Sequence, residues 1–265
     1  GHGLQVDLDA LEPYYRMPTT YPELFQIDSN TNQVCVLHLW ENLDDYQSKA
    51  YYGTCSLLAD AGYQYDVVFG VEEYDIWGEV NRYPAPEYPL SLDQITNYDL
   101  VIIPELTDVT PTHAQIMLDY VNQGGNLLVF TSTSNINTIQ NQRGMDPNIN
   151  SLLDHLREEE ATIGSGSLIT IDQVKGTQYI DTPEHPILLD FIGMVEQTGI
   201  APTITGMTEG TISKTMYSTT SEVVVHIVNN RYDWMQDTVK PVPDKTLNIK
   251  IPTEMTDETL TVRYY

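Results

Sequence analysis

The sequence predicts an α/β protein built on a doubly wound parallel sheet and followed by an antiparallel β-rich extension. Three observations predict this class. Short apolar runs rich in β-branched residues alternate with amphipathic segments, glycines stand where the amphipathic segments end, and strand-length runs without helical segments take over after residue 210. The alternation is typical of strand–helix–strand units, in which a right-handed crossover makes consecutive strands parallel.

The clearest unit begins with Leu100–Ile103, a run too short for a helix and apolar enough for a strand buried on both faces. Thr110 is a candidate N-cap, because proline follows it at the first helical position. Gly124 and Gly125 supply the left-handed geometry that ends this helix. The run Asn126–Thr131 is then the next strand.

A similar unit precedes it. The first strand is Val34–Trp40, an apolar run interrupted by His38, which we interpret as a core histidine. A helix is expected from Asp44 to Ala61, with acids at its start that suit the helix dipole, and Tyr65–Gly70 is the second strand. Two such units predict a flavodoxin-like sheet.

Three regions are predicted along the chain. Residues 1–33 form an arm, residues 34–205 the α/β domain, and residues 206–265 a sandwich-like β-rich extension. Within the second region we expect a polar loop and a variable segment after Thr131. These are followed by a helix over 151–160, a strand over 168–171 and a helix over 186–195. The extension is expected to hold strands at 211–217, 222–228, 245–251 and 259–264.

The charge balance limits the partners. Lys and Arg total 12 against 38 Asp and Glu, a formal charge of −26, which repels phosphate backbones and argues against nucleic-acid binding. Halophily would explain the imbalance, but a charged fraction of 19% is modest for it. An extracellular or cell-surface protein fits better. No apolar run of about 18 residues exists, so no membrane span is expected.

The two cysteines, Cys35 and Cys55, fall on a predicted strand and on the following helix. We expect two small buried hydrophobes, and their closeness in the predicted fold leaves a disulfide open. Gly164-Ser165-Gly166-Ser167 is not a phosphate loop, because the Gly-Lys-Ser/Thr ending is missing and a strand follows it rather than preceding it. No cofactor is therefore expected.

Two segments begin like a calcium loop. Asp28, Asn30 and Asn32 alternate as oxygen ligands do, but position six is Gln33 and position twelve is Leu39. The segment that starts at Asp146 fails in the same way. We interpret both as polar turns and expect no metal.

A long aromatic segment, residues 71–92, follows the second strand and would overhang the sheet edge where such folds bind ligands. Trp77 and Tyr83 in this segment, with Trp234 in the extension, are candidate carbohydrate contacts. Plain packing and a subunit interface are the alternatives.

Several of these runs resemble a known family. Asp99–Pro104, the helix after it and Gly124–Phe130 are similar to class I glutamine amidotransferase-like domains. They are closer to the degenerate version found in family 42 β-galactosidases and related secreted glycoside hydrolases. There the domain supports trimerisation and helps to shape the surroundings of the active site. Val225–Asp233 resembles the short β-sandwich that such enzymes carry next. The resemblance covers roughly residues 34–131 and 222–265.

The resemblance implies a missing nucleophile. In an active amidotransferase the strand after Gly-Gly delivers a cysteine onto a strained turn near a histidine. Here Thr131 and Ser132 hold that place, without the flanking glycines of a nucleophile elbow. Ser132 with His155 or His185 as base is the weaker alternative.

Paired carboxylates are the other catalytic option, since glycoside hydrolysis needs two acids facing one another. Glu105 is the best candidate, because it follows a central strand at the predicted ligand edge; Glu72, Glu73 and Glu184 are weaker. A structural role in the loop before the next helix is the simpler interpretation of Glu105.

We therefore expect a non-catalytic module of a secreted or surface glycan-active protein, acting in oligomerisation or substrate framing. A structural module of an extracellular assembly and a glycoside hydrolase in its own right are the alternatives. The expected partners are a homo-oligomer or larger assembly, and carbohydrate.

Overall fold

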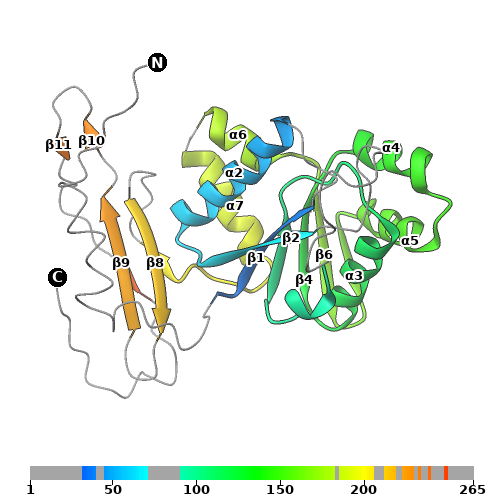
Figure 1. Ribbon diagram of the computed structural model, residues 1–265, viewed down its shortest axis with the longest axis horizontal. Helices are drawn as coiled ribbons and strands as arrows, with labels where there is room; N and C mark the ends of the chain where they lie inside the picture. Colours follow the sequence, from blue (N-terminus) through cyan, green and yellow to red (C-terminus); the bar gives the residue numbers. More distant parts are fainter. Residues whose placement is uncertain are drawn as a thin grey trace, which may run out of the picture.

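The computed structural model describes residues 32–39, 45–70, 90–182, 185–205, 212–218, 223–229, 232–233, 238–239 and 248–249. Its centre is a six-stranded sheet with the order β2-β1-β3-β4-β6-β5 (Figure 1). The strands are β1 (Val34–Leu39), β2 (Tyr65–Gly70), β3 (Leu100–Ile103), β4 (Asn126–Phe130), β5 (Glu160–Ile163) and β6 (Gly166–Ile171). All neighbouring pairs are parallel except β5 with β6. The predicted flavodoxin-like α/β fold is confirmed, with an antiparallel strand added at one edge.

Helices cover both faces of the sheet. One layer consists of α2 (Asp45–Ala61), α6 (Lys175–Asp181) and α7 (His185–Glu196), and the other of α3 (Pro111–Asn122), α4 (Thr133–Arg143) and α5 (Pro147–Leu156). Strand side chains alternate between the layers: Leu37 faces α3, whereas Val36 faces α2. None of the helices in the described ranges has the length and hydrophobicity that a membrane span requires.

The predicted helix signals act as expected at α3. The Thr110 hydroxyl accepts a hydrogen bond from the His113 amide at 3.2 Å, and Pro111 occupies the first helical position. Gly124 has φ of +108°, the left-handed conformation that the chain needs to leave the helix.

The segment after β4 was predicted wrongly. It holds α4, capped by the Ser132 side chain, where a loop was expected. Its sequence is too polar for a clear helical pattern, and among its residues Ile136 and Ile139 are buried. The next helix also begins earlier than predicted: the Asp146 carboxylate caps it by accepting from the amides of Asn148 and Ile149. Asp146 is thus the N-cap of α5, and residues 147–150, which were interpreted as a polar turn, form the first turn of that helix.

A short helix that the sequence did not indicate, α6, packs tightly on α2. A Cβ on Gly176 would lie 2.2 Å from the Ala50 carbonyl oxygen, and one on Gly53 would overlap Gly176. The two backbones can touch only because both positions lack a side chain. The Tyr179 hydroxyl donates a buried hydrogen bond to the Asp60 carboxylate at 2.5 Å and joins the same two helices.

The two cysteines are free. Cys35 is fully buried and faces the α3 layer, whereas Cys55 lies on α2 and packs in the opposite layer. The sheet separates them, so the disulfide that the sequence left open does not form. Burial raises the pKa of the Cys35 thiol to about 12, with a smaller contribution from the Asp66 carboxylate.

The C-terminal part is antiparallel where it is described. β8 (Ile212–Ser218) pairs with β9 (Val223–Asn229) and lies beside α2. β7 (Ile204–Thr205) pairs with β12 (Asn248–Ile249), and β10 (Tyr232–Asp233) with β11 (Thr238–Val239). The first two predicted strands of the extension are confirmed. The predicted strand over 245–251 is described only as β12, and the one over 259–264 lies outside the described residues.

Candidate functional site

The predicted ligand edge is formed by the carboxyl ends of the parallel strands. The strand order reverses between β1 and β3, the topological switch point at which α/β sheets of this kind bind ligands. The residues of interest follow β3 and β4 there. They are Glu105, Thr131 and Ser132.

Glu105 lies in a tightly held loop. It is 8% exposed, and its neighbour Leu106 is fixed from both sides. The Leu106 amide donates to the Phe130 carbonyl at 2.8 Å, and the Leu106 carbonyl accepts from the Thr131 hydroxyl at 2.7 Å. Glu105 is therefore buried at the sheet edge rather than presented on a free loop. The cap of the next helix is Thr110, not Glu105.

Thr131, which the sequence resemblance aligns with the cysteine of active amidotransferases, is engaged in structural bonds. It is 1% exposed; its amide donates to the Ile171 carbonyl at 3.1 Å, and its hydroxyl donates to Leu106. These bonds tie together the ends of β3, β4 and β6. The Thr131 hydroxyl therefore has a structural role, because it holds the loop after β3 against the end of β4.

Ser132 serves as a helix cap. Its Oγ accepts from the Asn135 amide at 3.1 Å, and its backbone is extended, with φ −116° and ψ 155°. This is not the strained turn that presents a nucleophile. Of the two proposed bases, His155 lies in the last turn of α5, in the layer opposite α7, which begins at His185. No hydrogen bond among the described residues joins Ser132 to His155.

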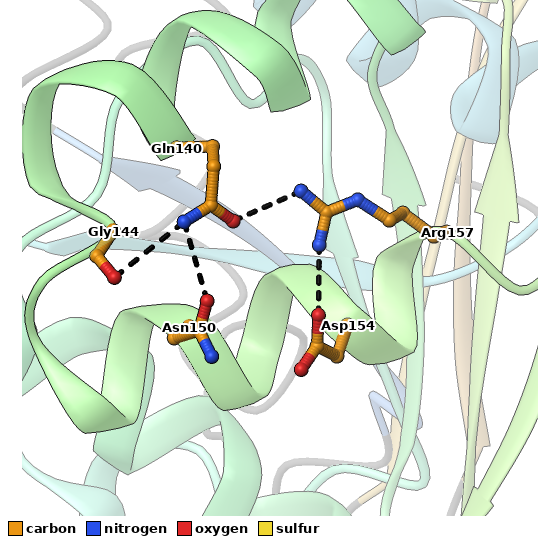
Figure 2. A network of polar contacts seen from close by, with 5 residues as sticks. All are labelled: Gln140, Gly144, Asn150, Asp154 and Arg157. Carbon is orange, nitrogen blue, oxygen red and sulfur yellow. Dashed lines mark hydrogen bonds and ion pairs between the residues drawn. The ribbon is translucent and has the colours of Figure 1, made fainter.

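An ion pair and a polar network fix the α4–α5 side of the edge. Arg143 on α4 binds Asp108 in the loop after Glu105. Figure 2 shows the neighbouring network, centred on Gln140. The Gln140 amide nitrogen donates to Asn150 Oδ1 at 3.2 Å and to the Gly144 carbonyl at 3.5 Å, and its oxygen accepts from Arg157 at 2.9 Å. Arg157 also binds Asp154 at 2.8 Å. These contacts connect α4 to α5.

His38 lies at the same edge, in the α2 layer. It is 5% exposed, and its ring stacks on Tyr51 with centroids 4.6 Å apart and meets the edge of Phe69 at 5.8 Å. Burial lowers the pKa of His38. The expected core role fits these contacts.

Sequence reasoning missed two buried residues near this edge. His113 is 0% exposed in the first turn of α3, and its Cε1 would lie 3.7 Å from a Cβ on Gly70 at the end of β2. Lys175, just after β6, is 7% exposed; its Nζ lies 2.7 Å from Asp190 and donates to Gln173. The contacts of His113 with Gly70 and of Lys175 with Asp190 join residues that are far apart in the sequence. The one available signal was the position of Lys175 after a strand at the ligand edge.

A small polar hollow of about 230 Å³ lies at the opposite edge, where β3 and β4 begin. Asp99 and Asn126 line it, and the Asn126 side-chain amide donates to the Asp99 carbonyl at 3.0 Å. No pattern in the sequence indicated this hollow.

The remaining sequence candidates are only partly placed. Asn32 donates its amide to Asp66 Oδ1 at 2.8 Å. Among the residues that the structure describes, no group of three or more His, Cys, Asp or Glu could hold a metal ion. The candidates that lie outside the described residues are Trp77, Tyr83, Trp234, Asp28, Asn30, Glu72, Glu73 and Glu184.

No protein-family model and no curated protein sequence matches the chain. Solved structures do match. A GH42 β-galactosidase from G. stearothermophilus matches with a TM-score of 0.44 and 11% identity, over 76% of this chain and 35% of that one. The β-galactosidase from Rahnella sp. R3 matches with a TM-score of 0.45 and 9% identity, over 76% and 36%. That from Bacillus circulans sp. alkalophilus gives 0.42 and 13%, over 75% and 35%. The chain thus spans about a third of the length of these structures.

Proposed function

We propose that the chain is a non-catalytic, amidotransferase-like module of a secreted or cell-surface glycan-active protein, and that it acts in assembly or in framing the substrate site. The observation that supports this most directly is the bonding of Thr131. At the position of the family's cysteine, both its amide and its hydroxyl are hydrogen-bonded to neighbouring loops and strands. Ser132, next to it, caps a helix.

The composition supports the proposed location and partners. A charge of −26 with 12 basic residues suits an acidic extracellular surface and disfavours nucleic acid. Carbohydrate remains the proposed small partner, with Trp77, Tyr83 and Trp234 as its candidate contacts.

An interaction module of an extracellular assembly is the second candidate. It is favoured by the 18 tyrosines of the chain and by large apolar side chains left on the surface, among them Tyr52 at 59% and Phe69 at 50% exposure. Both candidates are non-catalytic. They differ in the partner, which is a glycan-active protein in the first and an extracellular assembly in the second.

Two measurements test the proposal. A screen of chromogenic glycosides, β-galactosides included, is expected to give no turnover above buffer. Turnover that disappears in Glu105→Gln would overturn the non-catalytic assignment in favour of a glycoside hydrolase. Light scattering after size exclusion addresses assembly: a closed oligomer supports the first candidate, open polymers support the second, and a monomer at all concentrations counts against both.

A further inference from the structure

The two edges of the central sheet differ in how they are protected. At one edge β5 is four residues long, and glutamates at positions 158, 159 and 160 lead into it. At the other edge β2 is six residues long, Tyr-Asp-Val-Val-Phe-Gly, with neither lysine nor proline. Short strands, charges and prolines are the usual means of preventing edge-to-edge pairing. β5 is short and is preceded by charged residues, whereas β2 is longer and has a single charged residue, Asp66.

Exposure separates β2 from the strands beside it. Every residue of β1 and β3 is buried, whereas Tyr65 to Val68 of β2 are half-buried and Phe69 is 50% exposed. Among the described strands, β1 alone pairs with β2. Within the described part of the chain, the outer side of this largely apolar strand is thus left without a partner strand.

An aromatic rim continues this edge onto the α2 layer. Phe69 lies 6.2 Å from Tyr51 and 5.8 Å from His38, measured between ring centroids. Tyr51 in turn lies 5.1 Å from Tyr52, which is 59% exposed. A partner strand at β2 would therefore meet aromatic surface as well as backbone hydrogen-bonding groups.

We propose that β2 pairs antiparallel with β2 of a second copy of this chain and joins the two sheets around a two-fold axis. The proposal rests on the assembly part of the proposed function. A two-fold axis perpendicular to the sheet keeps each face in register with itself, so opposed residues belong to the same face. With the axis at Val67, Tyr65 lies opposite the partner's Phe69. This register creates two aromatic cross-strand pairs, the kind that stabilises antiparallel sheets.

The same register explains why a second copy suits this strand. Asp66 is the one charged residue of β2, and it would lie opposite Val68 rather than opposite another Asp66. Its carboxylate already accepts hydrogen bonds from the Asn32 amide and the Tyr98 hydroxyl, both at 2.8 Å within one protomer. A partner with a basic strand would require acidic side chains along this edge. The side chains of β2 are mainly apolar, so they suit an apolar strand such as β2 itself. Because each copy carries −26, self-association should strengthen as salt screens repulsion.

Sedimentation equilibrium across salt concentrations tests the pairing. The intact chain should form dimers whose dissociation constant falls as salt rises from 50 mM to 500 mM. Phe69→Lys should raise that constant by about tenfold or more, because it places two cations in the contact. Leu189→Lys is the matched control, since Leu189 on α7 is 53% exposed and lies outside β2. An equal effect of both variants, or dimers that weaken with salt, would overturn the proposal.

A cross-link tests the register without relying on Phe69. Val67→Cys should form a covalent dimer on mild oxidation, because residues opposed across an antiparallel pair have Cα atoms about 4.5–5.5 Å apart, within disulfide range. Wild type and Leu189→Cys should stay uncrosslinked. If the chain forms a closed oligomer but Val67→Cys does not cross-link, the β2 pairing is refuted and the proposed assembly role is retained. A chain that is monomeric under all conditions removes both.

Discussion

The guanidinium of Arg143 binds the carboxylate of Asp108 through two contacts, Nε to Oδ1 at 2.7 Å and Nη2 to Oδ2 at 2.8 Å. Asp108 Oδ1 also accepts from the Val109 amide at 2.8 Å. One carboxylate thus fixes its own loop and attaches it to α4. The pair is partly exposed, with side chains 35% and 24% accessible, so its contribution is modest despite the bidentate geometry.

Replacing Arg143 by methionine should lower the free energy of unfolding by about 1 kcal/mol or less. A double-mutant cycle with Asp108→Asn, followed by urea denaturation, isolates the coupling between the two side chains. Strict additivity of the two single variants would show that the pair contributes nothing.

Thr131→Val should destabilise the protein by about 1–2 kcal/mol, because it leaves the buried Leu106 carbonyl without its donor. Thr131→Ser keeps the hydroxyl and is the control. Thermal unfolding followed by circular dichroism measures both. A valine variant as stable as the serine variant would mean that this bond does not hold the edge together.

Gly176→Ala should destabilise by about 1–3 kcal/mol, because the new methyl group overlaps the backbone of α2. Gly193→Ala is the opposite case: nothing lies within 4 Å of its Cβ position in helix α7. There alanine should stabilise by about 0.5–1 kcal/mol through helix propensity. Chemical denaturation measures both variants. A Gly176→Ala variant no less stable than the Gly193→Ala variant would refute the α2–α6 contact.

Acid should destabilise the fold in part through His38. Burial lowers its pKa in the folded state, so the unfolded chain binds the proton more readily. The free energy of unfolding therefore falls as pH drops below the unfolded pKa, near 6.5, and this contribution stops changing once the folded pKa is passed. His38→Phe should flatten the slope of stability against pH in that window. An unchanged slope would assign the acid sensitivity elsewhere.

The thiol of Cys35 should resist alkylation in the native protein. Burial raises its pKa to about 12, so almost no thiolate exists at pH 8, and the side chain is also inaccessible. Cys55, which is partly exposed, should react first. Peptide mass spectrometry after iodoacetamide treatment, with and without urea, distinguishes the two sites. Native labelling of Cys35 at the rate of Cys55 would contradict its position in the core.

Local signals predicted the parts of the fold that are locally encoded. The apolar run Leu100–Ile103, the cap at Thr110 and the stop at Gly124 each carry their own reason for being where they are, and the structure follows all three. The helices α4 and α6 were missed for a different reason. Both are stabilised by distant contacts, such as the meeting of Gly176 with Gly53.

The candidate site was predictable in place but not in detail. Parallel strands put Glu105 and Thr131 at the same edge of the sheet, and the strand–helix–strand pattern of the sequence predicts that the strands are parallel. The bond from Thr131 to Leu106 spans 25 residues, and the pairing of Lys175 with Asp190 depends on how α6 meets α7. Such pairings follow from packing and leave no periodic trace in the chain.

Phe130 stacks against Phe191, with ring centroids 6.3 Å apart and planes inclined by 21°, and this contact has a consequence for folding during synthesis. The α3-side layer has all its helices once residue 156 has emerged from the ribosome, whereas the α2-side layer must wait for α7. A nascent chain that ends near residue 180 contains α2 but not α7, so Phe130 would lack the ring that stacks on it. The layer that contains α2 would then be incomplete, whereas the layer of α3, α4 and α5 would already have all its helices.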